Sequence, residues 1–217
     1  MKKGLTEMVF ILDRSGSMNG LEKDTIGGFN SMVDKQRKEE GEAYISTVIF
    51  DDRSEVIHDR VPLDKIGKLT EDEYYVRGCT ALLDAVGQAI RHIGNVHKYA
   101  RDEDVPERTI FVITTDGMEN ASRYFTYDEL KKLISQQQEK YGWEFLFLGA
   151  NIDAAAEAGR IGIRPSNAVR YECDDVGLDV SYCAVAETVA SFRKEGSIKP
   201  SWKASIEADY KKRSKRR

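Results

Sequence analysis

Three oxygen-bearing side chains stand close together where an apolar run ends. In "MVFILDRSGSMNG" (8–20) the run stops at Asp13, and Ser15 and Ser17 follow with Gly16 between them. Hard divalent cations such as Mg²⁺ bind oxygen ligands, and protein sites supply them with hydroxyls and one or two carboxylates. The spacing therefore indicates a metal site, provided that the chain turns sharply at Gly16 so that both hydroxyls face Asp13.

A second acidic residue has the same position relative to another strand. The segment "RTIFVITTDG" (108–117) is apolar and β-branched, as buried strands are, and it stops at Asp116. In an open parallel sheet, ligand sites lie beyond the carboxyl ends of the strands, where the strand order reverses. We therefore expect Asp13 and Asp116 to lie at one edge of the sheet.

The elements that must position these residues alternate between strands and helices. Continuous apolar segments predict strands, and apolar residues at helical spacing predict the helices between them. A capping box at Thr126 and Glu129 marks one helix start, and Pro62 marks an edge strand that returns antiparallel. Besides the two strands above, we predict strands at 43–50, 55–63, 143–151 and 167–171, and helices at 20–41, 81–99, 126–142, 153–159 and 176–194. This order predicts an α/β fold, doubly wound and Rossmann-like, with a mostly parallel central sheet, one antiparallel edge strand and helices on both faces.

The length and composition fit one globular domain. The chain has 217 residues, of which 41% are hydrophobic and 32% are charged, enough for a sizeable interior and a solvated surface. The net charge is −4, but the last fifteen residues hold seven Lys and Arg against two Asp and Glu. We expect a domain over residues 1–195 and a basic C-terminal tail over 196–217 that is flexible or peripheral. If nucleic acid binds at all, we expect it at this tail, because an acidic body repels phosphates.

Cysteine usage and the N-terminal segment bear on location. Cys79, Cys173 and Cys183 are odd in number and lack C-x-x-C spacing, which argues against a disulfide framework and a zinc knuckle. We interpret them as small buried or half-buried thiols in a reducing, cytoplasmic setting. The first apolar run is too short for a signal-peptide core, and no segment reaches the roughly 18 apolar residues of a membrane span. We therefore expect neither secretion by the usual signal nor insertion into a membrane.

The residues around Asp13 closely resemble the von Willebrand factor type A (VWA) domain, in the form of a bacterial stand-alone member. "DRSGS" matches the family's D-x-S-x-S sequence, and Thr80 in "RGCTALLDA" falls in the loop that carries the family's metal-site threonine. "TTDG" supplies the aspartate after the next long strand, and the resemblance covers residues 5–195. Asp84 and Glu119 stand beside these motifs, and we favour surface or capping roles for them over contacts that support the ligands.

The resemblance implies a metal-ion-dependent adhesion site (MIDAS) that holds Mg²⁺ or Mn²⁺. Its ligands would be the hydroxyls of Ser15, Ser17 and Thr80 and the carboxylates of Asp13 and Asp116, directly or through water. In the family, a carboxylate of a partner protein commonly completes the coordination, so the implied function is metal-dependent protein–protein interaction without catalysis. Aromatic residues of neighbouring loops could form an apolar rim around the partner's acidic residue; they are Tyr74, Tyr75, Tyr124, Phe125 and Tyr127.

Two enzymatic interpretations remain open. A Mg²⁺-dependent phosphotransferase of the haloacid-dehalogenase type would use Asp13 as its nucleophile, but it needs a second acid where this chain has Ser15. A serine hydrolase needs a G-x-S-x-G elbow, which does not occur, and a histidine base. His58, His92 and His97 occupy strand and helix positions typical of structural residues. Neither phosphate-binding glycine motif occurs, so we expect no bound nucleotide.

Overall fold

A six-stranded sheet forms the centre of the computed structural model, which describes residues 1–214. The strand order is β3-β2-β1-β4-β5-β6, and all neighbours pair in parallel except β2 and β3. The strands are β1 (Lys2–Asp13), β2 (Glu42–Phe50), β3 (Ser54–Pro62), β4 (Pro106–Thr115), β5 (Glu144–Ala150) and β6 (Ala168–Tyr171). The predicted mostly parallel sheet with one antiparallel edge strand is confirmed.

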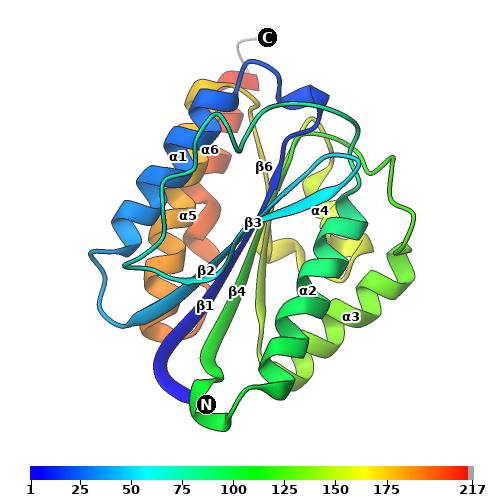
Figure 1. Cartoon of the computed structure of the whole chain (residues 1–217). Coiled ribbons are helices and arrows are strands. Elements are labelled where there is room, and N and C mark those ends of the chain that lie inside the picture. Colours follow the sequence, from blue (N-terminus) through cyan, green and yellow to red (C-terminus); the bar gives the residue numbers. More distant parts are fainter. Residues whose placement is uncertain (215–217) are drawn as a thin grey trace.

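Helices cover both faces of this sheet (Figure 1). One face carries α1 (Glu22–Gln36), α5 (Asp175–Glu195) and α6 (Ala204–Ser214), and the other carries α2 (Leu82–Tyr99), α3 (Tyr127–Tyr141) and α4 (Ala154–Arg160). Short 3₁₀ turns lie at Gly16–Met18, Asp102–Asp104, Pro165–Asn167 and Pro200–Lys203. The fold is thus doubly wound, as predicted. Among the described residues, no helix combines the length and the apolar character that a bilayer crossing requires.

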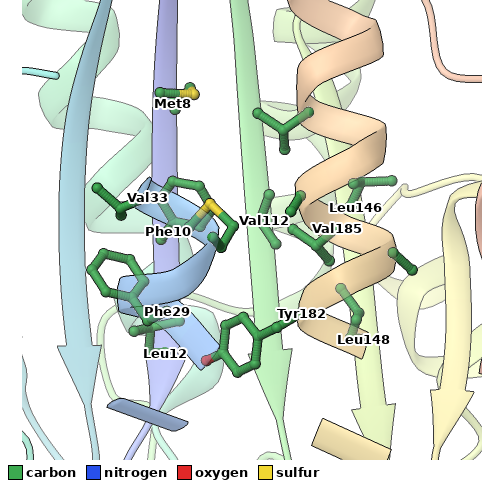
Figure 2. Packing of buried hydrophobic residues seen from close by; sticks show 14 of the residues in the cluster. Met8, Phe10, Leu12, Phe29, Val33, Val112, Leu146, Leu148, Tyr182 and Val185 are labelled. Carbon is green, nitrogen blue, oxygen red and sulfur yellow. The ribbon is translucent and has the colours of Figure 1, made fainter. Parts of the chain in front are cut away.

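The core between the sheet and α1 and α5 is built from strand side chains that point toward these helices. Figure 2 shows Phe10 of β1 and Val112 of β4 on the side of Phe29 of α1 and Tyr182 of α5. The rings of Phe10 and Phe29 meet edge to face, with centroids 5.6 Å apart. A Cβ on Gly28 of α1 would lie 2.2 Å from Cδ2 of Tyr182. The two helices can therefore approach closely only because position 28 has no side chain.

Two helix ends show what local sequence signals can specify. The helix α3 begins with the predicted capping box, in which Thr126 and Glu129 bond to each other's backbone, and it ends at left-handed Gly142. The helix predicted to extend to Gly41 instead ends at Gln36, and two backbone turns close it. Gly41 has a φ of +91° and belongs to the connection to β2. Its conformational freedom serves that connection and not the helix end.

The C-terminal segment differs from the flexible or peripheral tail that its basic composition predicted. Residues 200–214 form a 3₁₀ turn and α6, and Trp202 and Ile206 are buried in the same core as α1 and α5. The Trp202 indole N–H also donates to Ser166 O at 2.9 Å. Two apolar side chains therefore anchor a segment whose charge suggested a solvated end. Residues 215–217 lie outside the described residues.

The three cysteines are free thiols in the structure. Cys173 is half-buried, but Cys79 and Cys183 are exposed, so the expectation of buried or half-buried thiols is wrong for these two. Cys79 lies in the loop before α2, and Cys183 lies on α5. The apolar residues near Cys79 and Cys183 in the sequence do not indicate that these two thiols are exposed.

Candidate metal site

The two acidic residues predicted for a metal site lie where the strand order reverses. Asp13 is the last residue of β1, and Asp116 follows the last residue of β4. β1 and β4 are parallel neighbours in the middle of the sheet, and the chain winds outward from them in opposite directions. Such a point leaves a crevice between the loops that follow the two strands. The topology therefore brings together two carboxylates that are 103 positions apart in the chain.

The Asp13 carboxylate is buried and ties the two strand ends together. Its Oδ1 accepts a hydrogen bond from Ser15 N at 2.7 Å. Its Oδ2 accepts from Thr115 Oγ1 at 2.7 Å and from Asp116 N at 3.3 Å. The Tyr74 hydroxyl donates to the Asp13 carbonyl oxygen from the loop before α2. Removing this carboxylate would leave the amides of Ser15 and Asp116 without this acceptor and the Thr115 hydroxyl with its longer bond to Gly117 O, at 3.3 Å, so Asp13 supports the fold in addition to any contact with a metal.

The two serines lie at the 3₁₀ turn that follows β1. Ser15 Oγ and Ser17 Oγ are 3.2 Å apart, with Ser15 buried and Ser17 exposed. Gly16 N holds the turn by donating to Gly78 O at 3.2 Å. The φ of Gly16 is not in the left-handed region, and a Cβ there would make an ordinary contact, 3.5 Å from Gly78 O. The serines therefore face each other, but the turn does not need the conformational freedom that we expected Gly16 to supply.

Thr80 comes from the loop before α2 and is held in place by Asn120. Thr80 N donates to Asn120 Oδ1 at 2.9 Å, and Asn120 N donates back to Thr80 O at 3.0 Å. A Cβ placed on Gly117 would lie 3.4 Å from Thr80 Oγ1 and 3.6 Å from Ser17 Oγ. Both hydroxyls therefore face the residue next to Asp116. Three loops place hydroxyl and carboxylate oxygens in one small region.

The electrostatics of this region favour a bound cation. Burial raises the pKa of Asp13, although its hydrogen-bond donors oppose the shift. Burial also raises the pKa of Asp116; Cys173 and Asn151 lower it by donating to this carboxylate, and the charge of Asp13 raises it further. Two unneutralised carboxylates are thus disfavoured here, and a divalent cation would neutralise them. Within residues 1–214 no group of three or more His, Cys, Asp and Glu side chains could hold a metal, so a metal at this site depends on the hydroxyls. Two carboxylates with three hydroxyls are a donor set that Mg²⁺ and Mn²⁺ accept.

Two asparagines that the sequence analysis did not single out hold the predicted ligands. The Asn151 side-chain amide donates to Asp116 Oδ1, and Asn120 fixes Thr80. Asn151 directly follows β5, so the signal that identified Asp13, a polar residue after an apolar strand, also applies to it. Asn120 lies in an irregular loop, where no such signal exists.

Glu119 caps the first turn of α2, in line with the expected capping role, whereas Asp84 is buried and accepts from loop amides and not from a helix end. The Asp84 carboxylate accepts from three consecutive backbone amides, 123–125, at 2.7–2.9 Å. The Glu119 carboxylate accepts from Leu83 N in the first turn of α2 at 2.9 Å, and from residues of its own loop. These bonds attach the loop after β4 to the start of α2. Because the same loop bonds to Thr80 through Asn120, these bonds help to fix the position of Thr80.

The aromatic residues predicted around the site fall into two groups. Tyr74 and Phe125 are buried under the loops, and Tyr127 is half-buried. Tyr75 is 43% exposed and Tyr124 is 74% exposed. Of these five residues, Tyr75 and Tyr124 are therefore the ones best placed to contact another molecule.

Several solved structures are similar to this chain, whereas no protein-family model and no curated protein matches it. Von Willebrand factor type A from Catenulispora acidiphila gives a TM-score of 0.59 at 16% identity over 85% of this chain and 42% of that one. The vWF domain of the type V pili tip protein Mfa5 from Porphyromonas gingivalis gives 0.59 at 12% identity, over 89% of this chain and 98% of that one. Proximal thread matrix protein 1 from the mussel byssus, in a structure with a zinc-occupied MIDAS motif, gives 0.58 at 17% identity over 86% of this chain and 46% of that one.

These similarities concern the arrangement of strands and helices. The chain spans 46% of the byssus protein and 42% of the Catenulispora protein, so each of these contains much that has no counterpart here. The pili-tip domain is covered almost completely, over 98% of its length. At 12–17% identity these structures show that the fold is shared, and they do not show what this chain binds.

Proposed function

We propose that this chain, which has the fold of von Willebrand factor type A domains, binds Mg²⁺ or Mn²⁺ and recognises a protein partner through the ion. The proposed ligands are the hydroxyls of Ser15, Ser17 and Thr80 and the carboxylates of Asp13 and Asp116, directly or through water. The observation that carries the proposal is the convergence of these groups. The two serine hydroxyls are 3.2 Å apart, and those of Ser17 and Thr80 both face the residue after Asp116.

The solvent side of this site is where a partner would approach. Of the five proposed ligands Ser17 is exposed and the other four are buried, so the ion would be reached from the side of Ser17. A bound hard cation accepts a further oxygen ligand, and its charge would attract a carboxylate of the partner. Exposed Tyr75, Met118 and Tyr124 lie in loops at this edge and would contact apolar surface beside that carboxylate.

Binding fits the site better than catalysis. Phosphotransfer of the haloacid-dehalogenase type would require Asp13 to present a free carboxylate oxygen to a phosphoryl group. Asp13 is buried, and both of its oxygens accept hydrogen bonds from the chain itself. The position of the second acid holds Ser15, whose hydroxyl faces Ser17. Mg²⁺-dependent hydrolysis of a phosphate ester that is lost in Asp13→Asn would favour the enzyme.

The proposed setting follows from the sequence. We propose a cytoplasmic location because the three cysteines are unpaired, and unpaired thiols persist in reducing compartments. A nucleotide is not proposed as a ligand, because the glycine-rich phosphate-binding motifs are missing from the sequence. The proposed partner is a protein that offers a carboxylate.

Thr80→Val tests the metal site with little change to the fold. Valine keeps the shape of threonine and removes its hydroxyl, and Thr80 Oγ1 makes no hydrogen bond to another described residue. In calorimetric titrations with Mg²⁺ and Mn²⁺ we expect at least about tenfold weaker binding than in wild type. Thr47→Val is a matched control: Thr47 Oγ1 is buried in β2, away from the site, and has no hydrogen-bond partner among the residues that the structure describes, so affinity should not change. Equal affinity in wild type and Thr80→Val, or no binding in wild type, would refute the proposed site.

Partner recognition requires a second experiment. Capture from a lysate is compared in Mg²⁺ and in EDTA, with wild type and with Thr80→Val. We expect a partner to be retained only by wild type in Mg²⁺, and its affinity to fall when one of its acidic residues is replaced by the amide. A partner that binds equally well in EDTA would show that recognition does not use the ion.

A further inference from the structure

A buried ion network joins the turn after β1 to the loop before α2. The side chains of Arg14 and Asp51 are fully buried, with Arg14 Nε 2.9 Å from Asp51 Oδ2. Arg77 Nε donates to the same oxygen at 2.5 Å. Both guanidinium groups also pair with Glu55 Oε1, at 2.8 Å for Arg14 and 2.7 Å for Arg77. Both lie against the ring of Tyr75, 5.1 and 5.5 Å from its centroid. Two positive and two negative groups thus form one cluster around an aromatic ring.

The backbone shows that this cluster fixes the loop before α2. Arg77 N donates to Arg14 O at 3.0 Å, and Ala81 N donates to Asp51 O at 2.7 Å. Between these two bonds, left-handed Gly78 (φ +68°) lies so close to the β2–β3 turn that a Cβ on it would be 3.2 Å from Asp51 Cβ. The last part of the loop, 78–80, which carries Thr80, is therefore held at both of its ends, and Asp51 takes part through its side chain and its backbone.

We propose that Asp51 is a positioning residue for the metal site, because its buried carboxylate joins Arg14 of the serine turn to Arg77 and so fixes Thr80 relative to both serines. The inference rests on the proposed function, since an effect on metal affinity requires a bound ion. Asp51 makes no hydrogen bond to any of the five proposed ligands within the described residues. Its effect on the ion is therefore indirect and acts through the geometry of the hydroxyls.

The charge of Asp51 is essential to this role. Burial raises the pKa of this carboxyl, but the bond from Arg77, other hydrogen bonds and the charge of Arg14 together hold it below its ordinary value. Asp51→Asn keeps the size of the side chain and removes the charge. Among residues 1–214, buried Arg14 then keeps Glu55 alone, whose side chain is 45% exposed, as its counter-charge. A buried charge that loses its main partner is strongly unfavourable, so we expect the loop to move toward solvent.

Glu7→Gln provides a matched control for Asp51→Asn. The side chain of Glu7 is also fully buried, and its Oε2 accepts from Arg60 Nε at 2.8 Å, but it lies six residues before Asp13 within β1. Both variants should lower the midpoint of guanidinium unfolding. We expect Asp51→Asn to weaken Mn²⁺ binding in calorimetry by about 10- to 100-fold and Glu7→Gln to leave it unchanged. Should Asp51→Asn fail to fold, Arg77→Gln, with a partly exposed side chain, allows the same comparison.

Amide hydrogen exchange in metal-free protein separates this inference from the proposed function. The amides of Arg77 and Ala81 should exchange faster in Asp51→Asn and at the wild-type rate in Glu7→Gln. Wild-type Mn²⁺ affinity in folded Asp51→Asn, or an equal loss of affinity in Glu7→Gln, would overturn the positioning role. If wild type binds no Mn²⁺, the proposed function fails. The exchange rates of the Arg77 and Ala81 amides then test whether Asp51 positions the loop, and unchanged rates in Asp51→Asn overturn the inference.

Discussion

The loop after β4 depends on one carboxylate, and its removal gives a prediction whose size follows from the structure. Asp84, in the first turn of α2, accepts from the amides of Arg123 and Tyr124, which are exposed residues, and of Phe125, which is buried. Asp84→Ala leaves all three amides without this acceptor. The two exposed amides can bond to water instead, whereas the third stays in a dry environment.

The expected loss of stability for Asp84→Ala is about 3–4 kcal/mol, since a hydrogen bond to a charged group contributes about 1.5–3 kcal/mol and re-solvation recovers part of the two exposed bonds. Asp128→Ala is the matched control. Asp128 also lies in the first turn of its helix, α3, but it is exposed and makes no side-chain hydrogen bond to a described residue. Its loss should cost only about 0.3–1 kcal/mol, from the helix dipole alone.

Guanidinium denaturation followed by the fluorescence of Trp143 and Trp202, both buried, measures these losses. Because Asn120 belongs to the same loop and bonds to Thr80, Asp84→Ala should also weaken Mg²⁺ binding. If Asp84→Ala and Asp128→Ala lose the same stability, the three bonds to Asp84 do not hold the loop, and the reasoning fails.

Two further predictions concern packing and pH. Gly28→Ala should destabilise the chain by about 1–3 kcal/mol, because its Cβ would meet the Tyr182 ring, whereas Gly27→Ala, with open space around it, should add up to about 1 kcal/mol of helix stability. Thermal unfolding distinguishes them, and equal effects would contradict the packing argument. Burial raises the folded-state pKa of Asp13 and of Asp116 above the ordinary value of 3.8. Between the ordinary and the raised pKa, the metal-free folded state binds more protons than the unfolded state, so the stability of the metal-free protein should fall as pH increases. Over the same interval the affinity for Mg²⁺ should rise, because the carboxylates lose the protons that compete with the ion. Calorimetry and denaturation at several pH values test this, and an affinity independent of pH would contradict it.

The elements before residue 196 were predictable because their signals are local, whereas α6 was not predicted. The buried face of α1 consists of the residues that its helical spacing selects: Thr25, Phe29, Met32, Val33 and Gln36. The start and end of α3 follow from a capping box and a glycine within a span of seventeen residues. Apolar β-branched runs identified β2 and β4 in the same way. Each signal needs only the neighbours of a residue in the chain.

The contacts that fix the site were not predictable, because their partners are far apart in the chain. Arg14 stands between two polar residues in "DRSGS", a context typical of an exposed arginine, yet its side chain is fully buried. Its partner Asp51 lies 37 positions away. In the same way, Asn120 meets Thr80 across 40 positions and Asn151 meets Asp116 across 35. These pairs can be identified only once the order of the strands in the sheet is known.

The structure also assigns different roles to the proposed ligands, which changes how the site must be tested. At a solvated strand end, Asp13→Ala would be expected to remove metal binding and leave the fold intact. Asp13 is instead buried and accepts three hydrogen bonds, two of which join β1 to the end of β4, so its loss should reduce both stability and binding. The Thr80 hydroxyl makes no hydrogen bond to another described residue, so its removal should affect binding alone. Only a hydroxyl variant can therefore show that a loss of metal binding comes from a lost ligand and not from a displaced strand.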